Sequence, residues 1–334
     1  MHQFIEKVSP SMNYRKFYAP IETELFEVEK LLREFLSCEN PFIDRVVHHG
    51  FQLGGKRMRP ALLLLFAKMT GDVLPQHRTL AAAIETIHTA TLIHDDILDE
   101  ATTRRHLPTV NVVWNNETSV LLGDFMVARA IRQVTELECT EVSHLVAQTS
   151  CRLCEGEMRQ VGFRGNLALS EETYNSIIQD KTASLCECAC LLGVFFSSTQ
   201  QEWREGAITF GRHLGMAFQI ADDLLDIRGE ESQMGKSLGT DLAKQKLTLP
   251  MIRLLAVLEE NSRQTLHSAL QNESVEEVRP KIQALLQEHA IYESVCETAQ
   301  KHIQTAISSL EIFPENPSRT ALEELARYVM ERKH

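Results

Sequence analysis

Residues 80–100 read LAAAIETIHTATLIHDDILDE, and this stretch decides the fold class. Its apolar residues recur at steps of three and four, which predicts a long helix. The helical pattern ends in an acidic motif, in which Asp95 and Asp99 stand four positions apart. Residues at this spacing share one helix face, about 5–6 Å apart at Cβ, so their carboxylates are able to hold hard cations together.

A second acidic motif, ADDLLD at residues 221–226, repeats the spacing with Asp222 and Asp226. One such motif alone is equally compatible with a solvated helix face. Apolar residues precede both motifs, however, and buried carboxylates are costly unless cations compensate them. Magnesium takes one or two carboxylates from a protein and completes its shell with water and phosphate oxygens. Two facing motifs therefore predict a diphosphate bound through bridging magnesium ions.

The rest of the chain also reads as helices joined by short turns. Apolar residues follow helical steps in segments such as Ile21, Leu25 and Val28, and strand-like alternation is scarce. Proline and glycine punctuate these segments, as at Asn40-Pro41 and at Gly71. We therefore predict an all-α protein with one continuous core, organised as a single domain over residues 1–334, of which residues 1–20 are loosely ordered.

Composition excludes several classes of function. The chain has 334 residues, and its formal net charge of −12 argues against general nucleic-acid binding. Its apolar runs are far shorter than the roughly 20 residues that cross a bilayer, and we see no secretory signal, so we expect no membrane insertion and a cytoplasmic location. The eight cysteines do not form a convincing metal pattern, and we expect reduced, buried thiols.

Basic residues gather at a few positions in this acidic chain. In GGKRMRP, residues 54–60, Lys56 and Arg59 stand three apart at a predicted helix start, where backbone donors also favour anions. The others flank the acidic motifs: Arg104, Arg105, Lys181, Lys236 and Lys246. Singly, each fits a surface charge. Together they supply the positive charge that two diphosphates require, one diphosphate held through magnesium and the other by arginine and lysine alone.

With these motifs in view, the chain resembles the trans-isoprenyl (polyprenyl) diphosphate synthase family, in particular its long-chain, octaprenyl type. The resemblance spans about residues 54–250 and rests on an ordered series of motifs. They are GGKRMRP (54–60), IHTATLIHDDILDE (87–100), RRHLPT (104–109), GDF (123–125), KTASL (181–185), QIADDLLD (219–226) and GKSLGTDLAKQKLTLP (235–250).

The resemblance assigns roles residue by residue. It implies two or three Mg²⁺ ions on Asp95, Asp99 and Asp222, with Asp96, Asp223 and Asp226 in support. It implies an isopentenyl diphosphate site at Lys56, Arg59, His88 and Arg105. The allylic diphosphate site would be Arg104, Lys181, Thr182, Gln219, Lys236 and Lys246. The chain departs from the family at His106 and Gln245, where glycine is usual.

By the same resemblance, the allylic carbon–oxygen bond ionises, isopentenyl diphosphate attacks, and a proton leaves. The protein mainly stabilises the departing diphosphate, which makes Asp95, Asp99, Asp222, Lys181 and Arg104 the expected catalytic set. We assign no protein base: His88 and His94 fit substrate-binding or structural roles better. The segment 234–239 has the glycines of a lid over the substrates.

Small residues before the first acidic motif bear on product length. In the family, bulky aromatics at the fourth or fifth position before Asp95 go with short products, and this chain has Thr91 and Ala90 there, with Thr86 one turn earlier. Close helix packing is the alternative explanation. We expect a deep central cavity that admits a long product of about C35–C50.

The expected fold is thus an all-α bundle around that cavity, with the acidic motifs facing each other at its mouth. The resemblance implies a homodimer that passes its product to membrane enzymes. Three other readings stay open: a short-chain farnesyl or geranylgeranyl synthase, a terpene cyclase, and a catalytically silent partner subunit. The second DDxxD disfavours the cyclase, and the complete set of aspartates and arginines disfavours the silent subunit.

Overall fold

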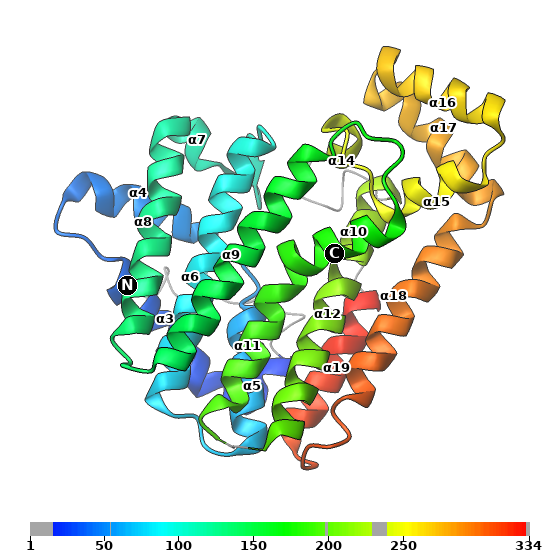
Figure 1. Ribbon diagram of the computed structural model, residues 1–334. Helices are drawn as coiled ribbons and strands as arrows, with labels where there is room; N and C mark the ends of the chain where they lie inside the picture. The colour runs from blue at the N-terminus through cyan, green and yellow to red at the C-terminus, as the bar shows by residue number, and fades with distance from the viewer. Residues whose placement is uncertain (1–15, 54, 198–199, 229–238, 332–334) are drawn as a thin grey trace.

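The computed structural model describes residues 16–53, 55–197, 200–228 and 239–331, and nearly all of its regular structure is helical (Figure 1). The all-α prediction is confirmed. After the short 3-10 turn η1 (Ala19–Ile21), the first half contains α3 (Glu22–Leu36), α4 (Pro41–Gln52), α5 (Met58–Thr70), α6 (Pro75–Leu98), α7 (Val110–Val113), α8 (Asn116–Thr135) and α9 (Thr140–Gly162).

The second half begins with α10 (Glu171–Ile178), and a π-helical turn, η2 (Gln179–Ala183), leads into the next helix. The remaining helices are α11 (Ser184–Phe195), α12 (Gln201–Arg228), α14 (Thr240–Ala243), α15 (Leu249–Val257), α16 (Glu260–Asn272), α17 (Val275–Glu288), α18 (Ile291–Ser308) and α19 (Pro317–Glu331). Two short strands, β1 (Thr103–Arg104) and β2 (Leu107–Pro108), pair antiparallel directly after α6.

Local chemistry explains where several helices begin. Asn40 caps α4 by accepting hydrogen bonds from the backbone of Phe42 and Ile43, and a proline occupies the first turn. Asn115 and Ser170 cap α8 and α10 in the same way. These side chains satisfy backbone donors that a helix start leaves without partners.

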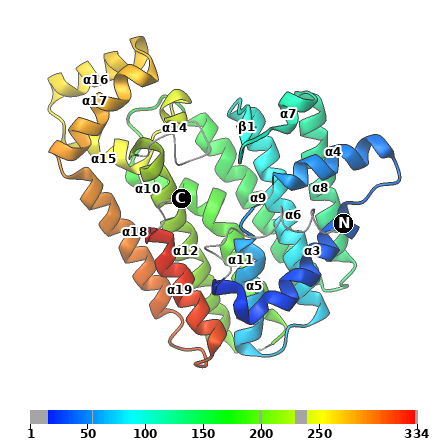
Figure 2. The same cartoon turned by 180° about the vertical axis from the view of Figure 1, so that it is seen from behind.

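The centre of the bundle is formed by α5 and α11, whose residues are buried on nearly every face. Helices that are apolar all round belong in the interior. On either side, α6 packs against α8 and α5, while α12 packs against α11 and α18. In Figures 1 and 2, the hairpin β1–β2 and α14 lie at the same end of the bundle, and α16 and α17 project beyond it.

The expectation of one continuous core is corrected by the packing. Buried apolar side chains form two clusters, a larger one around α5, α6 and α11 and a smaller one around α15, α17 and α18. Helix α12 belongs to both, since Phe210 lies in the larger cluster and Ile220 in the smaller. The second acidic motif stands on the part of α12 that meets the smaller cluster.

The N-terminal expectation is also modified. Residues 1–15 lie outside the described residues, but residues 16–21 are helical, with Phe17 and Tyr18 buried. Phe17 packs against Tyr328 at a ring distance of 5.3 Å. Loose order therefore does not extend to residue 20, because these aromatic side chains are anchored in the core.

The cysteines behave partly as expected. All eight are free thiols, and Cys186, Cys188 and Cys190 are buried on α11. Cys151 and Cys154 are exposed on α9, which corrects the expectation of burial for that pair. In the ranges given above, no helix combines the length and the apolarity needed to cross a membrane.

Candidate active site

The first acidic motif closes α6, at the end of the bundle that carries the hairpin. Asp95 is in the last turn and Asp99 is the C-cap residue, whose backbone N–H donates to the Asp95 carbonyl at 2.8 Å. The Asp99 carboxylate accepts from Lys246 Nζ at 2.8 Å and lies 3.5 Å from Arg164 Nη2. Residues from three distant parts of the chain thus meet at Asp99.

Lys181 reaches the other carboxylate of this motif. Its Nζ lies 3.9 Å from Asp95 Oδ2, donates to Gln160 Oε1 at 2.8 Å and forms an ion pair with Glu157. Lys181 belongs to the π-helical turn η2, a distortion that often occurs at functional sites. Gly156 on α9 permits this approach, because a Cβ there would lie 2.6 Å from the Lys181 backbone nitrogen.

The second acidic motif lies on α12, where protein donors hold Asp223 and Asp226. Asp223 accepts from the Tyr174 hydroxyl at 2.6 Å and from Gln219 Nε2 at 2.7 Å. Asp226 accepts from the backbone N–H groups of Thr240 and Asp241, at 3.3 and 3.2 Å. Asp222 is half-buried one turn before Asp226. The Thr182 hydroxyl donates to Gln219 Oε1 at 2.8 Å, which joins the turn η2 to this helix.

Electrostatics connect the two acidic motifs through Asp241. Burial and then Asp226 raise the pKa of Asp241 to about 7, and Asp99 acts in the same direction while Lys246 opposes it. Burial also raises the pKa of Asp95, against the attraction of Lys181. One carboxylate from each motif is therefore close enough to Asp241 to disfavour the ionised form of Asp241.

This carboxylate cluster fits magnesium in its donor chemistry. Its ligands are hard oxygens, and a buried carboxylate whose pKa is raised gains from a nearby cation. Across the described ranges, no three metal-binding side chains are gathered tightly enough to form a preassembled site. Lysine and arginine side chains hold the carboxylates instead, at Asp95 and at Asp99.

Asp96 differs from its neighbours in the motif. It is buried and accepts from Arg104, with Nε–Oδ1 and Nη2–Oδ1 distances of 2.9 and 2.8 Å. The Asp96 carboxylate therefore faces Arg104. The two predicted site residues are brought together as an orienting pair, in which the planar guanidinium is fixed by a buried carboxylate.

A second group of predicted residues is basic. Arg59 is 8% exposed, and its Nε is buried without a hydrogen-bond partner among the described residues. Burial, and then the positive charges of Arg59, Arg104 and Arg105, hold the pKa of His88 well below its usual range. The ring is therefore neutral at pH 7, in surroundings that favour an anion.

Residues 55–60 meet the β1–β2 hairpin in this basic group. The Arg105 guanidinium lies over Gly55, where an added Cβ would be only 2.0 Å from Nη2. Lys56 is half-buried in the same segment. The structure thus brings Lys56, Arg59, His88 and Arg105 to one neighbourhood. Lys236 and most of the predicted lid lie outside the described residues.

The two departures from the family pattern share one backbone feature. His106 has φ of 63° and Gln245 has φ of 54°, in the left-handed region that favours glycine. Arg105 also has positive φ, so the hairpin turn has the pattern of a type I′ turn. His106 and Gln245 therefore keep the backbone conformation that glycine favours, although both have side chains. The backbone carbonyl of Gln245 accepts a hydrogen bond from the Gly165 N–H at 2.9 Å.

The predicted chain-length residues occupy two faces of α6. Thr86 and Ala90 are fully buried, one turn apart on the same face, while Thr91 is half-buried. The hydroxyls of Thr86 and Thr91 donate to the carbonyls of Ala82 and His88, so both polar groups are satisfied within the helix. His94 contacts α8, where its Nε2 donates to the Val120 carbonyl at 3.2 Å.

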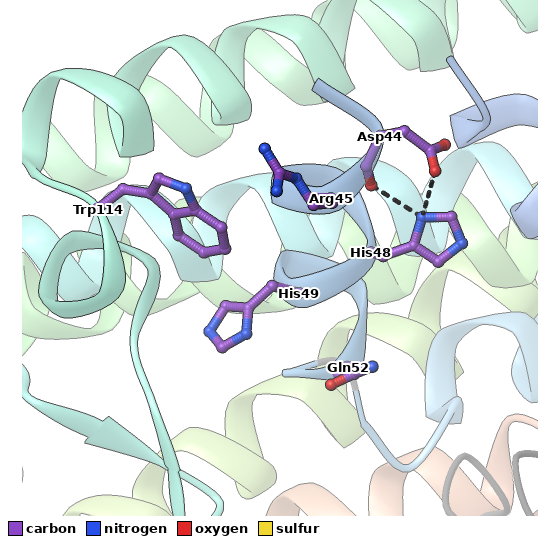
Figure 3. A pocket seen from close by; sticks show the side chains of 6 residues that line it. All are labelled: Asp44, Arg45, His48, His49, Gln52 and Trp114. Carbon is purple, nitrogen blue, oxygen red and sulfur yellow. Dashed lines mark hydrogen bonds and ion pairs between the residues drawn. The ribbon is translucent and has the colours of Figure 1, made fainter. Parts of the chain in front are cut away.

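A hollow of about 400 Å³ lies apart from the acidic motifs, on α4 and at the end of α7 (Figure 3). Its walls include Arg45, His49 and Trp114. His49 packs edge-on against Trp114, and its Nε2 donates to the Pro108 carbonyl at 2.8 Å. The hollow therefore contributes to the site indirectly, because His49 secures the hairpin that carries Arg104 and Arg105.

Several residues of this site were not predicted from the sequence. Glu157 and Gln160 come from α9, which has no recognisable motif, Arg164 comes from the turn after that helix, and Tyr174 comes from α10. Asp241 lies inside the quoted segment 235–250 but was not singled out. Only Asp241 carried a signal in the sequence, since it follows Gly239-Thr240 inside a quoted family motif, 15 residues after Asp226.

An all-α bundle with two acidic motifs linked through Asp241 and with adjoining basic groups is typical of a diphosphate-processing prenyltransferase. The polyprenyl synthetase family model matches residues 40–287, so the chain belongs to this family and is a prenyltransferase. Its relatives include the all-trans-nonaprenyl-diphosphate synthase (geranyl-diphosphate specific) of Rhodobacter capsulatus. That protein is 34% identical over 315 residues, covering 94% of this chain and 96% of the relative.

Two further similarities bear on function. Heptaprenyl diphosphate synthase component 2 of Geobacillus stearothermophilus is 31% identical, with 97% of this chain and 100% of the relative covered. The solved polyprenyl synthase of Caulobacter crescentus CB15, complexed with calcium and isoprenyl diphosphate, has a TM-score of 0.91 at 31% identity. That match covers 98% of this chain and 99% of the other. The predictions of family, fold and enzyme class are confirmed.

Proposed function

We propose that this chain condenses isopentenyl diphosphate with an allylic diphosphate, head to tail and with magnesium, to make a trans-polyprenyl diphosphate of about C35–C50. The observation that carries the proposal is the convergence of Asp95 and Asp99 with Lys181 and Lys246 at one end of the bundle. Lysines that now pair with carboxylates would turn to phosphate oxygens once cations neutralise those carboxylates.

In this proposal Asp95, Asp99 and Asp222 hold the magnesium ions, two or three per site. The metal, when bound, supplies electrostatic stabilisation of the leaving diphosphate. The other three aspartates would not contact the metal directly, because protein groups already hold them. Asp96 accepts from Arg104, Asp223 from Tyr174, and Asp226 from the backbone at residues 240–241. Their role is to orient the groups that touch the substrate.

The allylic diphosphate would lie against Lys181, Lys246 and Arg104, with Thr182 and Gln219 turned toward the developing cation. Lys236 joins this set by its place in the family motif. The hydrogen bond from Thr182 to Gln219 fixes two dipoles beside the acidic motif. Fixed dipoles and cations of this kind stabilise charge without reorganising during the reaction.

Isopentenyl diphosphate would bind at Lys56, Arg59, His88 and Arg105 without a metal. Arg59 supports this assignment because its buried Nε lacks a partner in the described part of the chain. A neutral His88 can donate one hydrogen bond while the arginines supply the charge. The two diphosphates are thereby separated by chemistry: one would be held through magnesium on the carboxylates with basic side chains in support, and the other by basic side chains alone.

Metal dependence tests the proposed reaction. The purified chain, supplied with isopentenyl and farnesyl diphosphates, should release product with Mg²⁺ and none after EDTA treatment, and added Mg²⁺ should restore turnover. Turnover that persists in EDTA would contradict the proposal. A chain that is inactive with Mg²⁺ but becomes active with a second protein would favour the partner-subunit alternative, which the name of the Geobacillus relative keeps open.

Product length is proposed to depend on the α6 face that carries Thr86 and Ala90. Both side chains are small and buried, and they precede Asp95 on the same helix, which suits an elongating chain that extends from the metal site. Ala90→Tyr should shorten the product to about three or four isoprene units, and Ala90→Leu should have a smaller effect in the same direction. Overpacking of a core position typically costs about 1–3 kcal/mol, so the melting temperature is measured alongside. An active Ala90→Tyr enzyme with an unchanged long product would contradict the tunnel.

We also propose that the chain forms a homodimer through α8 and α9. These neighbouring helices expose apolar side chains that include Leu121, 61% exposed, and Met158, 65% exposed. Contiguous exposed apolar side chains mark interaction surfaces, and a second copy would cover them. Light scattering after gel filtration should give a dimer mass for the wild type and a monomer mass for Leu121→Glu/Met158→Glu. A wild-type monomer would contradict this assignment.

A further inference from the structure

Arg57 lies between Lys56 and Arg59 in the sequence, but its side chain turns away from the solvent. It is 2% exposed and among the largest fully buried side chains in the described chain. Its Nη1 donates to Glu85 Oε1 at 2.9 Å, and its Nε donates to Glu29 Oε1 at 2.5 Å. The guanidinium also covers the Phe51 ring at 4.7 Å from the centroid. One arginine thus links α3, α4 and α6.

The backbone at Arg57 is unusual. Its φ of 53° and ψ of 31° place it in the left-handed region, and it is the N-cap residue of α5. A residue with a side chain adopts this conformation only where the surroundings impose it. Two sets of contacts impose this conformation at Arg57. Two carboxylates hold its side chain, and the carbonyl of the preceding residue, Lys56, accepts a hydrogen bond from the Tyr18 hydroxyl at 2.9 Å.

The partner Glu85 connects this turn to the basic group. Glu85 stands three residues before His88 on α6, so both lie on nearly the same helix face. Glu85 is itself 1% exposed, and its carboxylate accepts from Arg57. The ion pair between Arg57 and Glu85 therefore fixes the turn relative to α6, the helix that carries both His88 and Asp95.

We propose that Arg57 is a positioning residue for isopentenyl diphosphate: its buried ion pairs with Glu29 and Glu85 hold the left-handed turn that presents Lys56 and Arg59. This inference rests on the proposed function of Lys56, Arg59, His88 and Arg105. Arg57 itself does not touch the substrate. Its loss should weaken isopentenyl diphosphate binding selectively, because the side-chain contacts of Arg57 described above go to Glu29, Glu85 and Phe51, and none of these belongs to the proposed allylic site.

The test compares the Michaelis constants of the two substrates in Arg57→Met and in the milder Glu85→Gln, which keeps an acceptor oxygen. The KM for isopentenyl diphosphate should rise at least 10-fold in Arg57→Met and about 3-fold in Glu85→Gln. The KM for the allylic substrate should stay within 2-fold. Arg319→Met is the matched control, since Arg319 pairs with Glu323 at 3.2 Å and its N–H donates to Asn316, whose amide donates to the Met69 carbonyl near the opposite end of α5. It should leave both constants unchanged.

A glycine variant separates positioning from general damage. Arg57→Gly/Glu85→Gln restores freedom for the left-handed turn and removes one buried charge, so its KM for isopentenyl diphosphate should lie below that of Arg57→Met. Equal changes in both Michaelis constants, or no change in a folded Arg57→Met protein, would overturn the inference. Arg59→Ala distinguishes the two proposals: if it too leaves isopentenyl diphosphate binding unchanged, the proposed substrate site itself fails.

Discussion

Asp95→Asn tests the proposed metal site with little effect on the fold. We expect kcat to fall by at least about 10², the scale of losing one electrostatic contact to the transition state. At an effective dielectric constant of 20, the attraction between Lys181 and Asp95 at 3.9 Å is about 4 kcal/mol. Burial and repulsion from Glu157 and Asp99 oppose it, and Lys181 keeps its bond to Gln160.

The free energy of unfolding should therefore change by no more than about 1 kcal/mol in Asp95→Asn. Turnover is measured at saturating substrates over a range of Mg²⁺ concentrations, and stability by urea denaturation without metal. Glu155→Gln, at an exposed position on α9, is the control and should behave as wild type. Turnover of Asp95→Asn within 3-fold of wild type at saturating Mg²⁺ would refute the assignment.

Three other predictions follow from particular contacts. Arg59→Ala should raise the KM for isopentenyl diphosphate more than that for the allylic substrate, Lys246→Ala should do the reverse, and equal effects in both variants would show that the division of the basic residues is wrong. Gln245→Gly should raise the free energy of unfolding by up to about 1 kcal/mol in urea titrations, because glycine relieves the positive φ of 54°, and a loss of stability would contradict this. The rings of His213 and His302 share a hydrogen bond of 2.8 Å, and burial lowers the pKa of His302 to about 4 and also lowers that of His213. The stability that this neutral pair contributes is complete above about pH 6.5 and is lost as the pH falls toward 4. The free energy of unfolding of His302→Gln should therefore fall less between pH 7 and pH 4.5 than that of the wild type, by about 1 kcal/mol after allowance for partial exposure. An unchanged loss would contradict the role given to this pair.

The sequence predicted those features that depend on local spacing. The four-residue step from Asp95 to Asp99 required only helical geometry, and the apolar periodicity before it identified α6. Basic residues that are close to the acidic motifs in the sequence could also be predicted, because that proximity can be read directly from the chain. Asp99 departs slightly from the expectation, since it caps the helix, but its N–H still bonds to the Asp95 carbonyl.

Contacts between distant segments were not predictable in this way. No local pattern indicates that Arg57 is buried between Glu29 and Glu85, each 28 positions away, or that Asp96 is engaged by Arg104. The π-helical turn at Lys181 depends on how α9 approaches it at Gly156, which is a matter of packing. The split of the core into two clusters likewise arises from how helices meet, and periodicity within one helix does not report it.

The size of the product made by the purified chain alone tests the central claim most directly. The wild-type protein is incubated with isopentenyl diphosphate, farnesyl diphosphate and Mg²⁺, and the dephosphorylated products are separated by chromatography against polyprenol standards. We expect extension without any second protein, to about seven to ten isoprene units. No extension, or a product that stops at farnesyl or geranylgeranyl length, would contradict it.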